Sequence, residues 1–252
     1  MRILAVDTST NVATVAVVTD GILEGEYISN KGKTHSQRLM PMIDELLKTL
    51  AIKPNDIDAF SAAVGPGSFT GLRIGVTTIK GFGFALNKPV IGINTLDAMA
   101  YNLPFCSDII CPMIDARNNQ VFTAIYSGQA HSDINGVPKR TSEYMGVPVE
   151  ELTTLLKNTE GRVIFLGDCL KLHSEYFKLQ LGERAVFAPA SVAMPKASSV
   201  AQLASIMLAE GKTESAFDLK PFYLRKSQAE REAEKKAVER EAEKKLTERE
   251  AE

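Results

Sequence analysis

Two aspartates close apolar runs at corresponding places in the chain. Asp7 ends a run that starts at Ile3, and Asp115 ends a run that starts at Ile109. Two carboxylates that face each other across a cleft can position a divalent cation through water. An aspartate at a strand end also commonly accepts hydrogen bonds from backbone N–H groups of its own turn. We favour the turn, and we keep a weak nucleotide-binding cleft open as the second interpretation. The candidate residues of that cleft are Asp7, Thr8, Asp115 and Arg117.

A glycine-rich segment, V-GPGSFTGLRIGVTT-I, runs from Val64 to Ile79 after a strand-like stretch. Gly65 and Gly67 flank a proline, so the backbone can turn tightly before Ser68 or Thr70 caps a helix. Such a turn can aim backbone N–H groups at a phosphate. It lacks the Gly-Lys-Ser/Thr ending of a P-loop, and its third glycine comes one residue late for a dinucleotide loop. Phosphate contact and close packing against a neighbouring element both remain open.

Other reactive side chains form no recognisable site in the sequence. Ser68 lies beside glycines but has no G-x-S-x-G elbow and no evident histidine partner, which favours a helix cap over a nucleophile. The three histidines, His35, His131 and His173, are far apart, so we predict no metal site. The cysteines at 106, 111 and 169 cannot all pair and are interpreted as buried or incidental thiols.

Helical periodicity predicts a partner surface. In the helix after the glycine turn, a stripe of small residues lies beside a more apolar stripe, so this helix has two faces to bury. Each glycine costs a helix about 1 kcal/mol against alanine, and close approach of another helix would offset that cost. The preceding helix, 36–50, carries leucines and isoleucine at helical spacing. The predicted partner and dimer interface consists of Leu39, Ile43, Leu46, Gly71, Gly75, Thr78 and Phe82.

The elements that carry these residues repeat along the chain. The first half predicts strands 3–7, 12–18 and 22–28, helix 36–50, strand 58–64, helix 70–87, strand 90–93 and helix 95–101. The second half predicts strands 109–114, 121–126 and 140–146, helix 149–157, strand 163–166, helix 170–181, strand 185–187 and helix 199–209. Both halves therefore read βββαβαβα.

This duplication predicts an α/β fold. A repeated βββαβαβα unit, with an aspartate closing the first strand of each copy, is the plan of the two-lobed actin-like ATPase and sugar-kinase superfold, built from RNase H-like units. We predict a first lobe over residues 1–103, a second over 104–225, and a charged helical tail over 226–252. The tail repeats E-R-E-A-E-K-K with too few aliphatic residues for a coiled-coil seam, so a solvated helix is expected and a partner-binding arm is the alternative.

Composition limits the function classes. The chain has 252 residues and a formal charge of −2, and no Lys/Arg cluster stands out before the tail, so a large nucleic-acid footprint is not expected. No apolar run of membrane-spanning length and no leader-like apolar segment is evident, so we expect a cytoplasmic protein without membrane contact. Any RNA role would need a partner.

Five motifs resemble those of the bacterial TsaB family, also called YeaZ, over about residues 1–231. They are D-T-S-T after the first strand, K-T-H-S-Q-R-L-M-P-M-I at 33–43, G-P-G-S-F-T-G-L-R-I-G at 65–75, D-A-R at 115–117 and P-F-Y-L-R-K-S-Q-A-E-R at 221–231. The resemblance implies a non-catalytic subunit of the machinery that transfers threonylcarbamoyl from threonylcarbamoyl-AMP to N6 of adenosine 37 in tRNAs that read codons beginning with A.

The same resemblance implies partners. They are the catalytic paralogue TsaD, the P-loop ATPase TsaE, a second copy of the chain when it is alone, and tRNA only through the complex. Thr95 and Met99 stand where the paralogue has two metal-binding histidines, and neither is a good ligand for such a metal. We expect no tightly bound cofactor, with ATP or ADP only at the complex. The alternative function is an ATP-dependent phosphotransferase of the same superfold.

Overall fold

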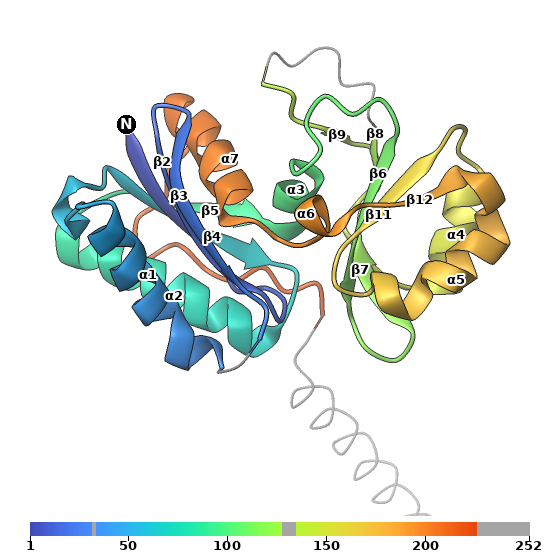
Figure 1. The fold of residues 1–252 in the computed structure, drawn as a ribbon, viewed down its shortest axis with the longest axis horizontal. Helices are drawn as coiled ribbons and strands as arrows, with labels where there is room; N and C mark the ends of the chain where they lie inside the picture. Colours follow the sequence, from blue (N-terminus) through green and yellow to red (C-terminus); the bar gives the residue numbers. More distant parts are fainter. Residues whose placement is uncertain (32–33, 128–134, 226–252) are drawn as a thin grey trace, which may run out of the picture.

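The computed structural model describes residues 1–31, 34–127 and 135–225, which form two α/β lobes (Figure 1). The charged tail predicted for residues 226–252 lies outside the described residues, as does His131. The strands of the first lobe are β1 (Arg2–Asp7), β2 (Ala13–Thr19), β3 (Ile22–Ser29), β4 (Ala59–Gly65) and β5 (Val90–Asn94). Its helices are α1 (His35–Thr49), α2 (Phe69–Leu86) and α3 (Thr95–Ala100).

The second lobe repeats this plan. Its main strands are β6 (Ile109–Asp115), β7 (Gln120–Thr123), β10 (Met145–Pro148), β11 (Val163–Leu166) and β12 (Ala185–Phe187). Its other elements are β8 (Tyr126–Ser127), β9 (Lys139–Arg140), α4 (Val149–Lys157), α5 (Leu170–Leu181) and α6 (Ala190–Ala193).

The two sheets have the same topology. The first has the order β3-β2-β1-β4-β5, and the second contains the order β10-β7-β6-β11-β12. In each, the first strand of the unit pairs antiparallel with the second strand and parallel with the strand after the first helix. The predicted duplication of RNase H-like units is therefore confirmed.

One predicted strand, 121–126, is divided in the structure, and the predicted strand 140–146 is displaced. β7 pairs with β6 at residues 113–115, and β8 pairs with β6 at Ile110. Pro112 lies between these two stretches and has no N–H to donate to a ladder. Its carbonyl instead accepts a hydrogen bond from Thr123 Oγ1 at 2.8 Å. The third strand of the sheet is β10, which begins at Met145.

The last helix, α7 (Ala197–Ala209), corrects the predicted lobe boundary. It was predicted within a second lobe over 104–225, but it packs on the first sheet (Figure 1). Val200 and Ala204 share an apolar cluster with Ile3 and Ala5 of β1. Helices α1 and α2 cover the opposite face of the same sheet, where Leu4 and Val6 point. The first sheet therefore obtains its second cover only when the chain returns from the second lobe.

The glycine stripe of α2 also faces its own chain. Both Gly71 and Gly75 are buried against Thr8, in the loop after β1. A Cβ on Gly71 would lie 2.0 Å from the carbonyl oxygen of Thr8, and one on Gly75 would lie 2.5 Å from Thr8 Oγ1. The predicted close approach is present, but the neighbour is this loop and not another chain. The assignment of both glycines to a partner interface is corrected accordingly.

Leu39, Ile43 and Leu46 belong to the same correction. They are each about 1% exposed and fill the core between α1 and the first sheet. Phe82 stacks on Phe60 of β4 with ring centroids 5.2 Å apart. Thr78 donates its hydroxyl to the carbonyl of Ile74 within the helix. Thr78 and Phe82 are only partly buried, so their place in a partner interface stays a prediction. Apolar residues at helical spacing here mark the chain's own core.

This packing gives a matched pair of substitutions on one helix. We predict that Gly71→Ala lowers the free energy of unfolding by about 1 to 3 kcal/mol, because the new methyl group would overlap a backbone carbonyl. Gly81→Ala should raise it by up to about 1 kcal/mol, since a Cβ at Gly81 meets nothing within 4 Å. Denaturant unfolding measures both. Equal effects of the two changes would contradict the close packing at Thr8.

Candidate ligand cleft between the lobes

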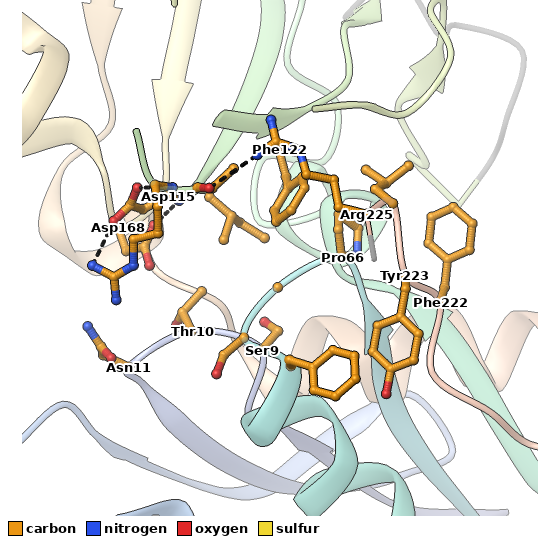
Figure 2. A pocket seen from close by; sticks show the side chains of 17 residues that line it. Ser9, Thr10, Asn11, Pro66, Asp115, Phe122, Asp168, Phe222, Tyr223 and Arg225 are labelled. Atoms are coloured by element: carbon orange, nitrogen blue, oxygen red, sulfur yellow. Dashed lines mark hydrogen bonds and ion pairs between the residues drawn. The ribbon is translucent and has the colours of Figure 1, made fainter. Parts of the chain in front are cut away.

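A cavity of about 300 Å³ lies between the lobes (Figure 2). Loops at the carboxyl ends of β1, β4, β6 and β11 surround it, together with the chain at 222–225. Clefts at the carboxyl ends of parallel strands are where ligands bind in open α/β sheets. The lining residues that Figure 2 labels are Ser9, Thr10, Asn11, Pro66, Asp115, Phe122, Asp168, Phe222, Tyr223 and Arg225.

Asp7 serves the turn that follows β1. Its Oδ1 accepts hydrogen bonds from Ser9 N at 2.8 Å and from Ser9 Oγ at 2.6 Å. The side chain is fully buried, and its Oδ2 is an unpaired buried oxygen. Burial raises the pKa of Asp7 to about 6, against the opposing effect of the Ser9 bonds. The predicted turn role of Asp7 is thus present in the structure.

Asp115 makes the equivalent turn in the second lobe but faces the cavity. Its Oδ1 accepts a hydrogen bond from Arg117 N at 2.8 Å, and its Oδ2 lies 3.4 Å from Arg117 Nη1. The backbone N–H of Asp115 donates to Asp168 Oδ1 at 3.0 Å. Burial raises the pKa of the Asp168 carboxyl above its usual range. A pair of carboxylates therefore stands on the second-lobe side of the cavity.

The glycine turn packs on the Ser9 loop. A Cβ on Gly67 would lie 2.3 Å from the carbonyl oxygen of Ser9. Ser68 N donates to that same carbonyl at 2.6 Å, and Ser68 Oγ accepts a hydrogen bond from Gly71 N at 3.3 Å. Ser68 is the helix cap that the sequence predicts. Contact of this turn with phosphate stays a prediction.

His35 and Arg38 hold the loop that enters the cavity from the first lobe. His35 Nε2 lies 2.7 Å from the carbonyl of Thr10, and Arg38 donates to the carbonyl of Asn11 at 2.5 Å. Arg38 also lies 3.2 Å from His35 Nδ1. This geometry fits a neutral ring that donates through Nε2 and accepts through Nδ1. Burial lowers the pKa of His35, in agreement with that form.

The structure brings only part of the predicted nucleotide cleft together. Asp115 and Arg117 line the cavity, whereas Asp7 and Thr8 are buried, with at most 1% of each exposed. Thr8 Oγ1 is used internally, since it donates to the carbonyl of Gly71 at 2.7 Å. Nucleotide binding stays a prediction, and any direct ligand contact belongs to the exposed residues of the cavity.

Sequence reasoning missed the lining residues that lie far along the chain. Asp168 follows Gly167 at the end of β11, as the glycine turn follows β4, and this repeat was the available signal. Residues 222–225 lie within a motif that the family resemblance used, but no periodicity assigned them to the cavity. Phe122 looked like an ordinary strand residue.

Residues 1–31, 34–127 and 135–225 contain no group of three or more His, Cys, Asp or Glu side chains at a spacing that would hold a metal ion. No helix in these ranges has the length and apolarity that crossing a bilayer requires.

The raised pKa of Asp7 makes stability depend on pH. Because the folded pKa of Asp7 is about 6 and the ordinary value of an aspartate is 3.8, the folded state binds more protons between these values, and its stability falls as pH rises through them. We predict that Asp7→Asn removes this pH-dependent loss of unfolding free energy, which amounts to at most about 3 kcal/mol. Urea unfolding of both chains at pH 4 and pH 7 tests it. If the free energy of unfolding changes with pH by the same amount in both chains, the buried Asp7 carboxyl does not have a raised pKa.

Comparisons with known proteins agree with this architecture. The family model described as TsaD, tRNA N6-adenosine threonylcarbamoyltransferase, matches residues 24–233. The chain is 33% identical to the tRNA threonylcarbamoyladenosine biosynthesis protein TsaB of Bacillus subtilis, over 91% of this chain and 96% of the relative. It is 30% identical to the TsaB of Escherichia coli, over 91% of this chain and 96% of the relative.

A solved structure gives the same result. YeaZ from Pseudomonas aeruginosa superposes with a TM-score of 0.72 at 26% identity, over 88% of this chain and 99% of that chain. Another Pseudomonas aeruginosa structure, of a protein described as similar to peptidase YEAZ, gives a TM-score of 0.74 at 27% identity, over 89% and 99%. Sequence identity over nearly the whole length, the match to the family model and the duplicated fold together show that the chain belongs to the TsaB (YeaZ) family.

Proposed function

We propose that the chain is a non-catalytic subunit in the synthesis of N6-threonylcarbamoyladenosine in tRNA. In this role it binds and orders the catalytic paralogue TsaD, which transfers threonylcarbamoyl from threonylcarbamoyl-AMP to N6 of adenosine 37 in tRNAs that read codons beginning with A. The ATPase TsaE joins the same complex, tRNA is reached only through it, and the work takes place in the cytoplasm. ATP or ADP acts at the complex and is not tightly held by this chain.

The observation that carries this proposal is the match to relatives named for this biosynthesis over about nine tenths of the chain. The structure adds a local argument. Thr95 and Met99 stand where the resemblance aligns the metal-binding histidines of the catalytic paralogue. Both side chains are completely buried in α3, and Met99 packs within an apolar cluster. These positions therefore contribute to packing in this chain.

The partner face that we propose uses the outward residues of α1 and α2. The inward residues of both helices are committed to the chain's own core. Met40 is 48% exposed and Phe84 is 66% exposed, and Thr77 is exposed between the inward positions of α2. Exposed apolar side chains on a helix suit a protein partner. The same face would pair two copies of the chain when the paralogue is absent.

Reconstitution tests the function directly. We predict that TsaD and TsaE with threonylcarbamoyl-AMP modify tRNA efficiently only when this chain is added, and that the chain alone modifies none. Mass spectrometry of the tRNA nucleosides measures the product. In parallel, a coupled assay measures ATP turnover by the chain alone. Turnover above about 1 per second, in the range of typical enzymes, would favour the alternative of a phosphotransferase.

A pair of surface substitutions tests the partner face. Thr77→Arg places a long charged side chain on the outward face of α2 and keeps good helix propensity, so the chain should still fold. We expect it to bind TsaD and its own copy more weakly, by roughly tenfold or more. Leu172→Arg on α5 is the control, since Leu172 is 66% exposed on the second lobe. Pull-down and sedimentation measure both. Unchanged capture by Thr77→Arg would locate the interface elsewhere.

A further inference from the structure

Two neighbouring crossings of the chain connect the lobes. The first leaves α3 towards β6, and the second runs from α6 to α7. Asn102 joins them, because its Nδ2 donates to the carbonyls of Val192 at 3.0 Å and Met194 at 2.8 Å. Its Oδ1 accepts a hydrogen bond from Ser199 Oγ at 2.7 Å. Two attachments at one place act as a hinge, because they restrain separation of the lobes more than rotation.

A second contact lies close to this hinge. Asp97 of α3 accepts hydrogen bonds from Tyr126 at 2.6 Å and from Tyr144 at 2.7 Å, and both tyrosines belong to the second lobe. Asp97 precedes Asn102 by little more than one helical turn, so this contact has a short lever arm against rotation. Leu96 and Met99 of α3 also pack in an apolar cluster with residues of the second lobe, such as Ile110. A restraint farther from Asn102 would act on the angle between the lobes with a longer lever arm.

A third connection is made by residues 215–225, which we call the latch. Its first part is held on the first lobe, where Leu219 is 1% exposed in the core and Lys80 of α2 donates to the carbonyls of Phe217 and Leu219. Phe222 N then donates to the carbonyl of Val64 at 2.8 Å. Gly65 makes this approach feasible, since a Cβ there would lie 2.3 Å from the Phe222 carbonyl oxygen.

The end of the latch reaches the second lobe. Arg225 donates to the carbonyls of Ala116 at 3.4 Å and Gly146 at 3.3 Å, and to Gln120 Oε1. Its guanidinium also lies 5.5 Å from the ring of Phe122 (Figure 2). These acceptors come from the turn after β6 and from β7 and β10, so one side chain contacts three separate segments of the second lobe.

Aromatic contacts continue the latch along the wall of the cavity. Tyr223 stacks on Phe69 with centroids 4.5 Å apart, and its hydroxyl accepts a hydrogen bond from Arg73 Nε at 3.1 Å. Phe222 contacts Tyr144 edge to face at 5.6 Å, which joins the latch to the Asp97 contact. Phe222, Tyr223 and Arg225 all line the cavity between the lobes.

We propose that the latch sets the angle between the lobes and hence the opening of the cavity, with Arg225 as its closing contact. The hinge at Asn102 permits rotation of one lobe relative to the other. The latch restrains this rotation because it ties β4 and α2 of the first lobe to the second lobe. Loss of the Arg225 contacts loosens this tie without breaking either hinge crossing and leaves the edge contact of Phe222 with Tyr144 between the latch and the second lobe. This inference concerns the isolated chain and does not depend on the proposed function.

Distance measurement between the lobes tests the proposal. Spin labels are attached to cysteines introduced at Ile22 and Leu179, which are 69% and 80% exposed on the first and second lobes, after Cys106→Ser. The labelled chain is diluted into unlabelled chain, so that only distances within one molecule are measured. We expect Arg225→Ala to widen or shift the distance distribution relative to the parent chain.

Arg184→Ala is the matched control. Arg184 also donates to backbone carbonyls, those of Leu156, Thr159 and Gly161, but all of them lie within the second lobe. It should lower stability and leave the distance distribution unchanged. A distribution for Arg225→Ala that equals the parent's would overturn the proposal, as would an equal widening in both variants. If Arg225→Ala does not fold, Arg225→Lys carries the same test, because lysine keeps the charge but not the forked donors.

Discussion

Close contact between two backbones organises this protein. Helix α2 and the glycine turn before it lie directly on the loop after β1, so that the carbonyl oxygens of Thr8 and Ser9 occupy the space of absent side chains at Gly71 and Gly67. Each glycine in a helix costs about 1 kcal/mol of helix stability. The close packing and the hydrogen bonds from Thr8 to Gly71 and from Ser68 to Ser9 offset that cost. The loop after β1 is thereby held in one position beside the cavity.

The duplicated turns show how one local motif acquires two roles. Asp7 and Asp115 each bond a backbone N–H two residues ahead, at the end of the first strand of their units. Asp7 is fully buried, whereas Asp115 stays partly exposed, with its side chain 24% accessible. The cavity consequently has its carboxylates on one side only. Tertiary surroundings, and not the motif, separate a structural carboxylate from one that a ligand can reach.

The chain's return to the first lobe makes the lobes interdependent. Helix α7 covers one face of the first sheet, and Leu219 joins the core on the other face. Both segments follow the second lobe in the sequence, so the first core is complete only after the whole chain has been laid down. Helix α2 carries the start of the latch on its surface and also the outward residues that we assign to a partner. A single helix thus contacts the core, the cavity wall and solvent.

Local pattern was sufficient for the elements and the plan of the fold. The helix predicted over 149–157 and the strand predicted over 163–166 have those bounds in the structure, because both depend on the spacing of apolar residues along a short segment. The repeat of βββαβαβα, with an aspartate in each copy, then indicated two equivalent lobes. This reasoning failed at Pro112 of β6. Pro112 has no N–H to donate, and the partner strand predicted over 121–126 is divided opposite it although its composition looks continuous.

Which surfaces meet was decided only by the tertiary structure. A stripe with Gly71 and Gly75 is equally compatible with a partner helix and with the chain's own loop, because helical spacing specifies a face and not its neighbour. Leu39 and Ile43 carry the same ambiguity, and they lie in the core. Helix α7 could be assigned to its sheet only by long-range contacts, and Arg225 has no periodic signal. Local residue pattern was enough to predict the elements and their duplication. The packing of distant segments placed the cavity, because contacts between segments far apart in the chain leave no local pattern.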